Sequence, residues 1–94
     1  MITKYNDFCL ICGRPHDDMH HIFKGNKQRH LATEDELLIP LCREHHEAIH
    51  SRQELNILCE IIGQLAYEKD RCSEGISPKD AREMFRVRYG RLYL

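Results

Sequence analysis

The chain has 94 residues, a formal net charge of −1, five cysteines and seven histidines. A chain of this length forms one domain and buries only about 60% of its unfolded surface, so we expect a bound metal to stabilise it. The near-zero charge argues against nucleic-acid binding through bulk electrostatics alone. The odd cysteine count, with no signal-peptide pattern and no apolar stretch of membrane-spanning length, predicts a soluble cytoplasmic protein rather than a secreted, disulfide-bonded one.

The N-terminal part predicts a zinc knuckle followed by a strand. Cys9 and Cys12 are separated by two residues and followed by a glycine, which lets the backbone turn tightly around a metal. Residues 19–23 form a short strand candidate that carries two adjacent histidines, His20 and His21.

The middle of the chain predicts a loop and a second strand. Residues 24–36 are polar, and we expect a loop with one turn of helix near Thr33, because Thr33 and Glu36 have the spacing of a capping box. Residues 37–41 follow as a short apolar strand, which Pro40 restricts to an edge or terminal position.

Three helices are expected in the remainder of the chain. Residues 43–51 form a helix that carries several histidines, and the apolar spacing of residues 55–66 marks a longer second helix. Ser77 and the proline after it predict the start of a third helix, which ends at the last glycine of the chain. We place Cys59 in the hydrophobic core and Cys72 in a connection, and assign neither as a ligand.

The spacing of the cysteines predicts one structural zinc. Each half of the motif region offers a pair of ligands with two residues between them, and the two pairs complete a tetrahedral set: Cys9, Cys12, Cys42 and His45. Other groupings stay open, because His46 and His50 continue a spacing of four residues from Cys42, and His16 follows the knuckle closely. Unlinked cysteines beside a surface histidine are the plainest alternative.

The surplus histidines predict a second metal site. His46 and His50 share one helical face, about 100° around the axis from His45, and His20 and His21 are the obvious ligands from the strand. Adjacent strand residues normally point to opposite faces, so both reach one cleft only if the strand bends, twists or ends there. Three histidine ligands leave positions open for water and substrate, as in catalytic metal sites.

Residues 9–50 resemble a known family. The motifs Cys-x-x-Cys-Gly, His-His-Ile-Phe and Pro-Leu-Cys-x-x-His-His-x-x-x-His are similar to those of HNH endonucleases, above all to small phage-type members such as recombination-enhancement nucleases. The resemblance implies a small α+β fold in a single domain, residues 1–94. Residues 9–50 would form a ββα-metal core with a zinc knuckle, and residues 51–94 would form an extension with two C-terminal helices.

The resemblance also implies a metal-dependent DNA endonuclease of low sequence specificity. Such an enzyme hydrolyses phosphodiester bonds and leaves 5′-phosphate and 3′-hydroxyl ends. His21 matches the general base that activates water, and a catalytic divalent metal (Mg, Mn, Zn or Ni) would be held by His20, His46 and His50. The four ligands of the predicted zinc match the structural zinc of the cysteine-containing branch of the family.

One departure from the family concerns the asparagine that gives it its middle letter. That residue would fall near Leu37, which can neither bind a metal nor orient an imidazole through its side chain. In the family this asparagine often orients the base, so we expect a backbone carbonyl or Asn26 to take that role here. Two groups of basic residues, one just after His21 and one near the C-terminus, are the candidate contacts to DNA phosphates: Lys24, Lys27 and Arg29, and Arg82 and Arg86.

The expected partner is DNA, with a homodimer or a partner protein helping to find the target and no membrane involved. The phage-type likeness implies a gene carried by a phage or prophage in a bacterial host. The main alternative is a non-catalytic, zinc-stabilised module that binds DNA or protein. A thiol oxidoreductase is disfavoured, because no βαβ pattern surrounds Cys9 and Cys12.

Overall fold

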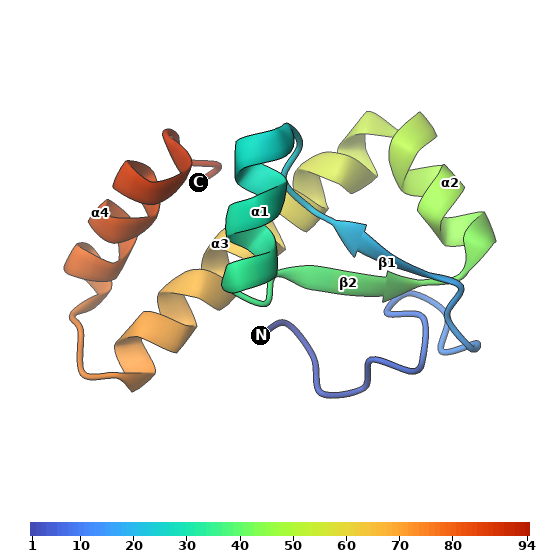
Figure 1. The fold of residues 1–94 in the computed structure, drawn as a ribbon, viewed down its shortest axis with the longest axis horizontal. Coiled ribbons are helices and arrows are strands. Elements are labelled where there is room, and N and C mark those ends of the chain that lie inside the picture. The colour runs from blue at the N-terminus through green and yellow to red at the C-terminus, as the bar shows by residue number, and fades with distance from the viewer.

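The computed structural model describes residues 1–94 and has two strands and four helices (Figure 1). In chain order these are β1 (Asp18–His21), α1 (Asn26–Glu34), β2 (Leu38–Leu41), α2 (Arg43–Ser51), α3 (Gln53–Ser73) and α4 (Pro78–Tyr89). The predicted small α+β class is therefore confirmed. In the view of Figure 1, α2 and α4 lie at opposite ends of the molecule, with α1 between them. None of the helices is both long and apolar enough to span a bilayer.

The sheet consists of β1 and β2 alone, paired antiparallel with Asp18 opposite Leu41 and His21 opposite Leu38. Each strand of a two-stranded sheet has a free edge, which is where proline is tolerated, so the prediction for Pro40 is confirmed. The carbonyl of Pro40 accepts a 2.9 Å hydrogen bond from the N–H of Leu10. This bond ties the N-terminal segment to β2.

Helix α2 begins directly after β2 and packs against both strands. Its bounds are those predicted from the sequence, and Ile49 anchors it in the core with 1% of its surface exposed. The elements β1, β2 and α2 follow one another as ββα, with α1 inserted between the strands. This order brings β1, which carries His20 and His21, alongside α2, which carries His46 and His50.

Residues 24–36 are not a loop, because Asn26–Glu34 forms helix α1. The predicted capping box is also wrong: Thr33 lies in the last turn, where its hydroxyl donates to the carbonyl of Arg29 at 3.0 Å, and Glu36 follows the helix with a φ of 57°. The segment looked like a loop because its residues are polar. Only Ala32 is fully buried, so polar residues cover an exposed helix rather than a connection.

The C-terminal helices begin much as predicted, but α3 runs further than expected. It continues to Ser73, so Cys72 lies within the helix and its assignment to a connection is wrong, whereas Cys59 is buried as expected. Residues 67 and 68 are buried, and this extends the packed face beyond the apolar run visible in the sequence. Before α4, the Ser77 side chain accepts a hydrogen bond from the N–H of Asp80, and the helix ends at a left-handed glycine, as predicted.

The hydrophobic core joins the strands to α3 and α4 around Phe23. The Phe23 ring lies 4.8 Å from the ring of Tyr89 and 5.2 Å from that of Tyr93, measured between centroids. Helix α3 approaches this ring closely at Gly63, where an added Cβ would lie 2.8 Å from Phe23 Cζ. Because Phe23 follows His21 by two residues, the C-terminal helices fix the end of β1.

Candidate metal centres

A first group of ligands, the cysteine cluster, lies where the N-terminal turn meets the start of α2. It consists of Cys9, Cys12, Cys42 and His45, whose ligand atoms all lie within 4.8 Å of one another. The His45 Nδ1 atom is 3.7 Å from Cys9 Sγ and 3.3 Å from Cys42 Sγ, and the sulfurs of Cys12 and Cys42 are 3.9 Å apart. A tetrahedron with zinc–sulfur distances of about 2.3 Å has edges of about 3.8 Å. The cysteine cluster can therefore hold a metal ion such as zinc.

The backbone around Cys9 prepares its sulfur to bind a cation. Gly13 adopts a φ of 76° and donates its N–H to the Cys9 carbonyl at 2.9 Å, which closes the knuckle. Burial opposes ionisation of the Cys9 thiol, but hydrogen bonds from the backbone of Cys42, Cys12 and Ile11 lower its pKa to about 6. Since the thiolate is the metal-binding form, this favours metal binding near neutral pH.

Arg14 is a neighbour of the cysteine cluster that the sequence analysis missed. Its Nε lies 3.2 Å from Cys12 Sγ, and its terminal nitrogen contacts Glu44 at 2.9 Å. The hydrogen bond from Arg14 lowers the pKa of the Cys12 thiol. Arg14 thus links the knuckle to the first turn of α2 and offsets negative charge on the thiolates.

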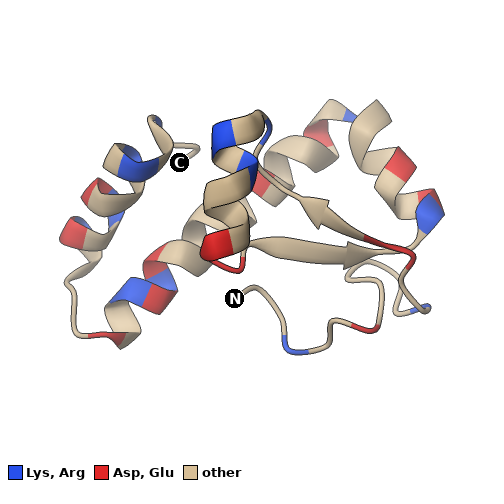
Figure 2. Cartoon of the chain, in the orientation of Figure 1, with Lys and Arg blue, Asp and Glu red and all other residues tan.

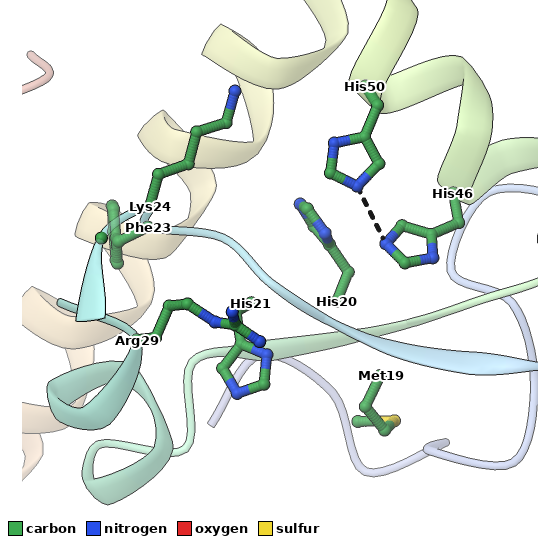
Figure 3. A pocket seen from close by; sticks show the side chains of 9 residues that line it. Met19, His20, His21, Phe23, Lys24, Arg29, His46 and His50 are labelled. Carbon is green, nitrogen blue, oxygen red and sulfur yellow. Dashed lines mark hydrogen bonds between the residues drawn. The ribbon is translucent and has the colours of Figure 1, made fainter. Parts of the chain in front are cut away.

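The second group, the histidine cluster, consists of His20 on β1 and His46 and His50 on α2. Figure 3 shows the three rings turned towards one another. The Nε2 atoms of His46 and His50 are 3.2 Å apart, and the His20 ring centroid lies 5.1 Å and 5.4 Å from theirs. Two imidazole nitrogens on one tetrahedral zinc are about 3.3 Å apart. The spacing therefore suits a shared metal ion.

His20 is the buried member of the histidine cluster. Only 4% of its surface is exposed, and its Nε2 has no hydrogen-bond partner. Burial, reinforced by the charges of His46 and His50, lowers the pKa of His20 to about 4, so its ring is neutral at physiological pH. A buried, unpaired nitrogen is costly, and a bound metal would satisfy it.

Asp18 orients one of these ligands. Its carboxylate accepts a 3.0 Å hydrogen bond from His46 Nδ1, which leaves His46 Nε2 facing His50. Arg43 Nε donates to the same oxygen at 3.2 Å. Carboxylates commonly fix metal-binding histidines in this way. The sequence could have indicated this role, because Asp18 lies two residues before His20 and therefore on the same face of β1.

His21 stands apart from the cluster but lines the same pocket. This cavity of about 490 Å³ is also bordered by Lys24, Arg29 and all three members of the histidine cluster. His20 and His21 alternate along β1 and reach one pocket because the strand ends at His21. In Figure 3 the His21 ring lies beside Arg29. Burial, and then the Arg29 charge, lower the pKa of His21 and favour its neutral form.

The alternative ligand groupings do not form. His46 and His50 gather with His20 rather than with Cys42, and His16 belongs to neither group. The two predicted sets of ligands are therefore the ones that the fold brings together.

Neither the position of the missing asparagine nor the side chain expected to replace it reaches His21. Leu37 is fully buried in the core, where an asparagine would need partners of its own. Asn26 is the first residue of α1 and does not line the pocket. The hydroxyl of Thr33 instead lies 3.2 Å from His21 Nε2.

The predicted phosphate contacts divide between two places. Lys24 and Arg29 line the pocket, and Lys27 lies with them near the start of α1, where Figure 2 shows a group of basic residues. Arg82 and Arg86 lie on α4 and pair with carboxylates instead, Arg82 with Glu68 at 3.2 Å and Arg86 with Glu83. The basic residues near α1 are thus the better placed to meet a ligand.

The fold and the two clusters define a small α+β protein with a Cys3His group able to hold a metal ion. The chain belongs to the family described as "Protein of unknown function (DUF968)", whose model matches residues 4–56. The matched part contains both clusters, both strands and α2, whereas α4 lies outside it.

The chain is similar to the uncharacterized protein YdfU of Escherichia coli strain K12, with 42% identity over 45 residues. The match covers 46% of this chain and 13% of YdfU, so the chain spans a small part of that relative's length. No solved structure matches the chain.

Proposed function

We propose that the protein is a metal-dependent DNA endonuclease of the HNH type, with low sequence specificity. The observation that carries the proposal is the pocket in which three histidines with converging ligand atoms adjoin a fourth histidine and two basic side chains. The ββα order of β1, β2 and α2, with ligands on the first strand and the helix, agrees with the motif resemblance.

The histidine cluster would hold the catalytic divalent metal. Its three imidazole nitrogen donors suit zinc or nickel, and three protein ligands leave coordination positions open. A metal bound there would act as a Lewis acid, polarising the scissile phosphate and stabilising the leaving 3′ oxygen. Asp18 contributes by holding the His46 ring in the orientation that ligation needs.

His21 would act as the general base. Its depressed pKa keeps the imidazole neutral, so it can take a proton from the attacking water near physiological pH. Lys24 and Arg29, on the rim of the same pocket, would hold the DNA backbone by its phosphates. The cysteine cluster would serve the fold through a closed structural zinc.

A second candidate is a zinc-stabilised module that binds DNA or protein without cleaving it. The observation in its favour is the 3.2 Å distance between His46 Nε2 and His50 Nε2, which also suits a hydrogen bond between them. Such a bond would leave His20 Nε2 unpaired in the interior, which is why we favour a metal ion shared by the three histidines.

Plasmid digestion tests the proposal. Purified protein is incubated with supercoiled DNA and Mg²⁺, Mn²⁺, Zn²⁺ or Ni²⁺, alone and with EDTA, and the DNA ends are analysed. We expect cleavage with at least one metal, loss of cleavage with EDTA, and 5′-phosphate ends. His46→Ala should be inactive, whereas His30→Ala, an exposed histidine outside both clusters, should cleave normally. DNA binding without any cut ends would favour the binding module.

A further inference from the structure

Helix α1 carries a side chain that reaches the proposed base from outside the motif. Thr33, in the last turn of α1, places its Oγ1 atom 3.2 Å from His21 Nε2. The same hydroxyl donates its hydrogen to the carbonyl of Arg29, four residues earlier, at 3.0 Å. The hydroxyl has one hydrogen, and this bond uses it, so towards His21 the oxygen can only accept.

This arrangement determines which nitrogen of His21 carries the proton. A neutral imidazole has one N–H donor and one acceptor nitrogen. Because Thr33 Oγ1 accepts, Nε2 must be the donor, and Nδ1 keeps the lone pair that can take a proton from water. A hydrogen bond at the far nitrogen also restrains rotation of the ring.

We propose that Thr33 is the positioning residue that holds His21 as the Nε2–H tautomer, in the role the family gives to its asparagine. This inference rests on the proposed nuclease function for its catalytic meaning. The helix supplies the rest of the frame, because the Arg29 carbonyl orients the hydroxyl and the Arg29 side chain lies in the pocket beside His21. Helix α1 thus supplies both a phosphate contact and the orienting group for the base, which lies at the end of β1.

The test compares Thr33→Val with Thr33→Ser. Valine keeps the branched shape of threonine but has no hydroxyl, whereas serine keeps the hydroxyl. We expect Thr33→Val to lower kcat about 10-fold, with KM and metal content unchanged. This loss is smaller than the loss of about 10²-fold or greater expected when the general base itself is removed. Thr33→Ser should restore kcat to within about 2-fold of the wild type, because the hydrogen-bond acceptor returns.

Nitrogen-15 NMR of labelled histidine reads the tautomer without relying on activity. The wild type and Thr33→Ser should show His21 with its proton on Nε2, and Thr33→Val should show a mixture of tautomers. An Nδ1–H tautomer in the wild type, or full kcat in Thr33→Val, overturns the assignment. If the wild type cleaves no DNA, the catalytic role falls together with the proposed function, while the spectra still decide whether Thr33 fixes the ring.

Discussion

Two adjacent histidines at the end of β1 have different surroundings, and this difference underlies the account at the scale of single residues. His20 is buried against His46 and His50, whereas His21 contacts α1 through Thr33. The alternation of a strand sends neighbouring side chains to opposite faces, so in the proposed function one strand end would supply both a metal ligand and a base.

Asp18 should control metal affinity at the histidine cluster. Replacing Asp18 with Ala removes the acceptor for His46 Nδ1, and we expect metal affinity to fall by about 10- to 100-fold. Calorimetric titration of Ni²⁺ into protein that holds one zinc per chain, in the cysteine cluster, measures this. Asp7→Asn, an exposed carboxylate outside both clusters, is the control and should bind normally. Equal affinities in Asp18→Ala and the wild type would exclude an orienting role.

The buried His20 should make stability depend on pH. Its pKa is about 4 in the folded chain against an ordinary value of 6.5, so between these values the unfolded chain binds more protons. The free energy of unfolding should therefore fall as the pH drops from about 6.5 towards 4. Denaturant unfolding at several pH values measures this, with His20→Gln as the comparison. A loss on acidification as large in the variant as in the wild type would contradict the prediction.

At the scale of elements, the sequence predicted the local features and the two ligand groups, and missed contacts between distant segments that no motif marks. Short ligand spacings such as Cys9 with Cys12, the helix of His46 and His50, and the Ser77 cap each depend on a few neighbouring residues. Helix α1 was missed because its polar residues carry little hydrophobic periodicity. Thr33 could not be assigned to His21, since their contact depends on how α1 packs against β1.

The close packing of α3 on the end of β1 gives a prediction for Gly63. An Ala side chain there would lie 2.8 Å from the ring of Phe23, which is fully buried and cannot move aside. We expect overpacking to cost about 1–3 kcal/mol, more than the ~1 kcal/mol that Ala gains over Gly in helix propensity. Thermal melting should show a lower Tm for Gly63→Ala. Leu65→Ala, on the exposed face of α3, should change Tm less, and an unchanged Tm in Gly63→Ala would contradict the packing argument.

At the scale of the whole molecule, the cysteine cluster connects the N-terminal turn to α2 in a chain with few buried residues. Zinc bound there would add its binding free energy to folding. We expect Cys42→Ser to lose the zinc and unfold most of the chain, as judged by elemental analysis and circular dichroism. Cys72→Ser, outside both clusters, should keep zinc and fold. Native melting with full zinc content in Cys42→Ser would show that the cluster does not hold the fold together.

The different roles proposed for His20 and His21 permit the most direct test of the account. DNA cleavage is measured for the wild type, His20→Ala and His21→Ala over a wide range of divalent metal concentrations. We predict that His20→Ala regains activity as the metal concentration rises, because it lacks only a ligand. His21→Ala should stay at least about 10²-fold slower at every metal concentration, because it lacks the group that takes the proton. Wild-type rates in His21→Ala, or no metal-dependent cleavage by the wild type, would contradict the account.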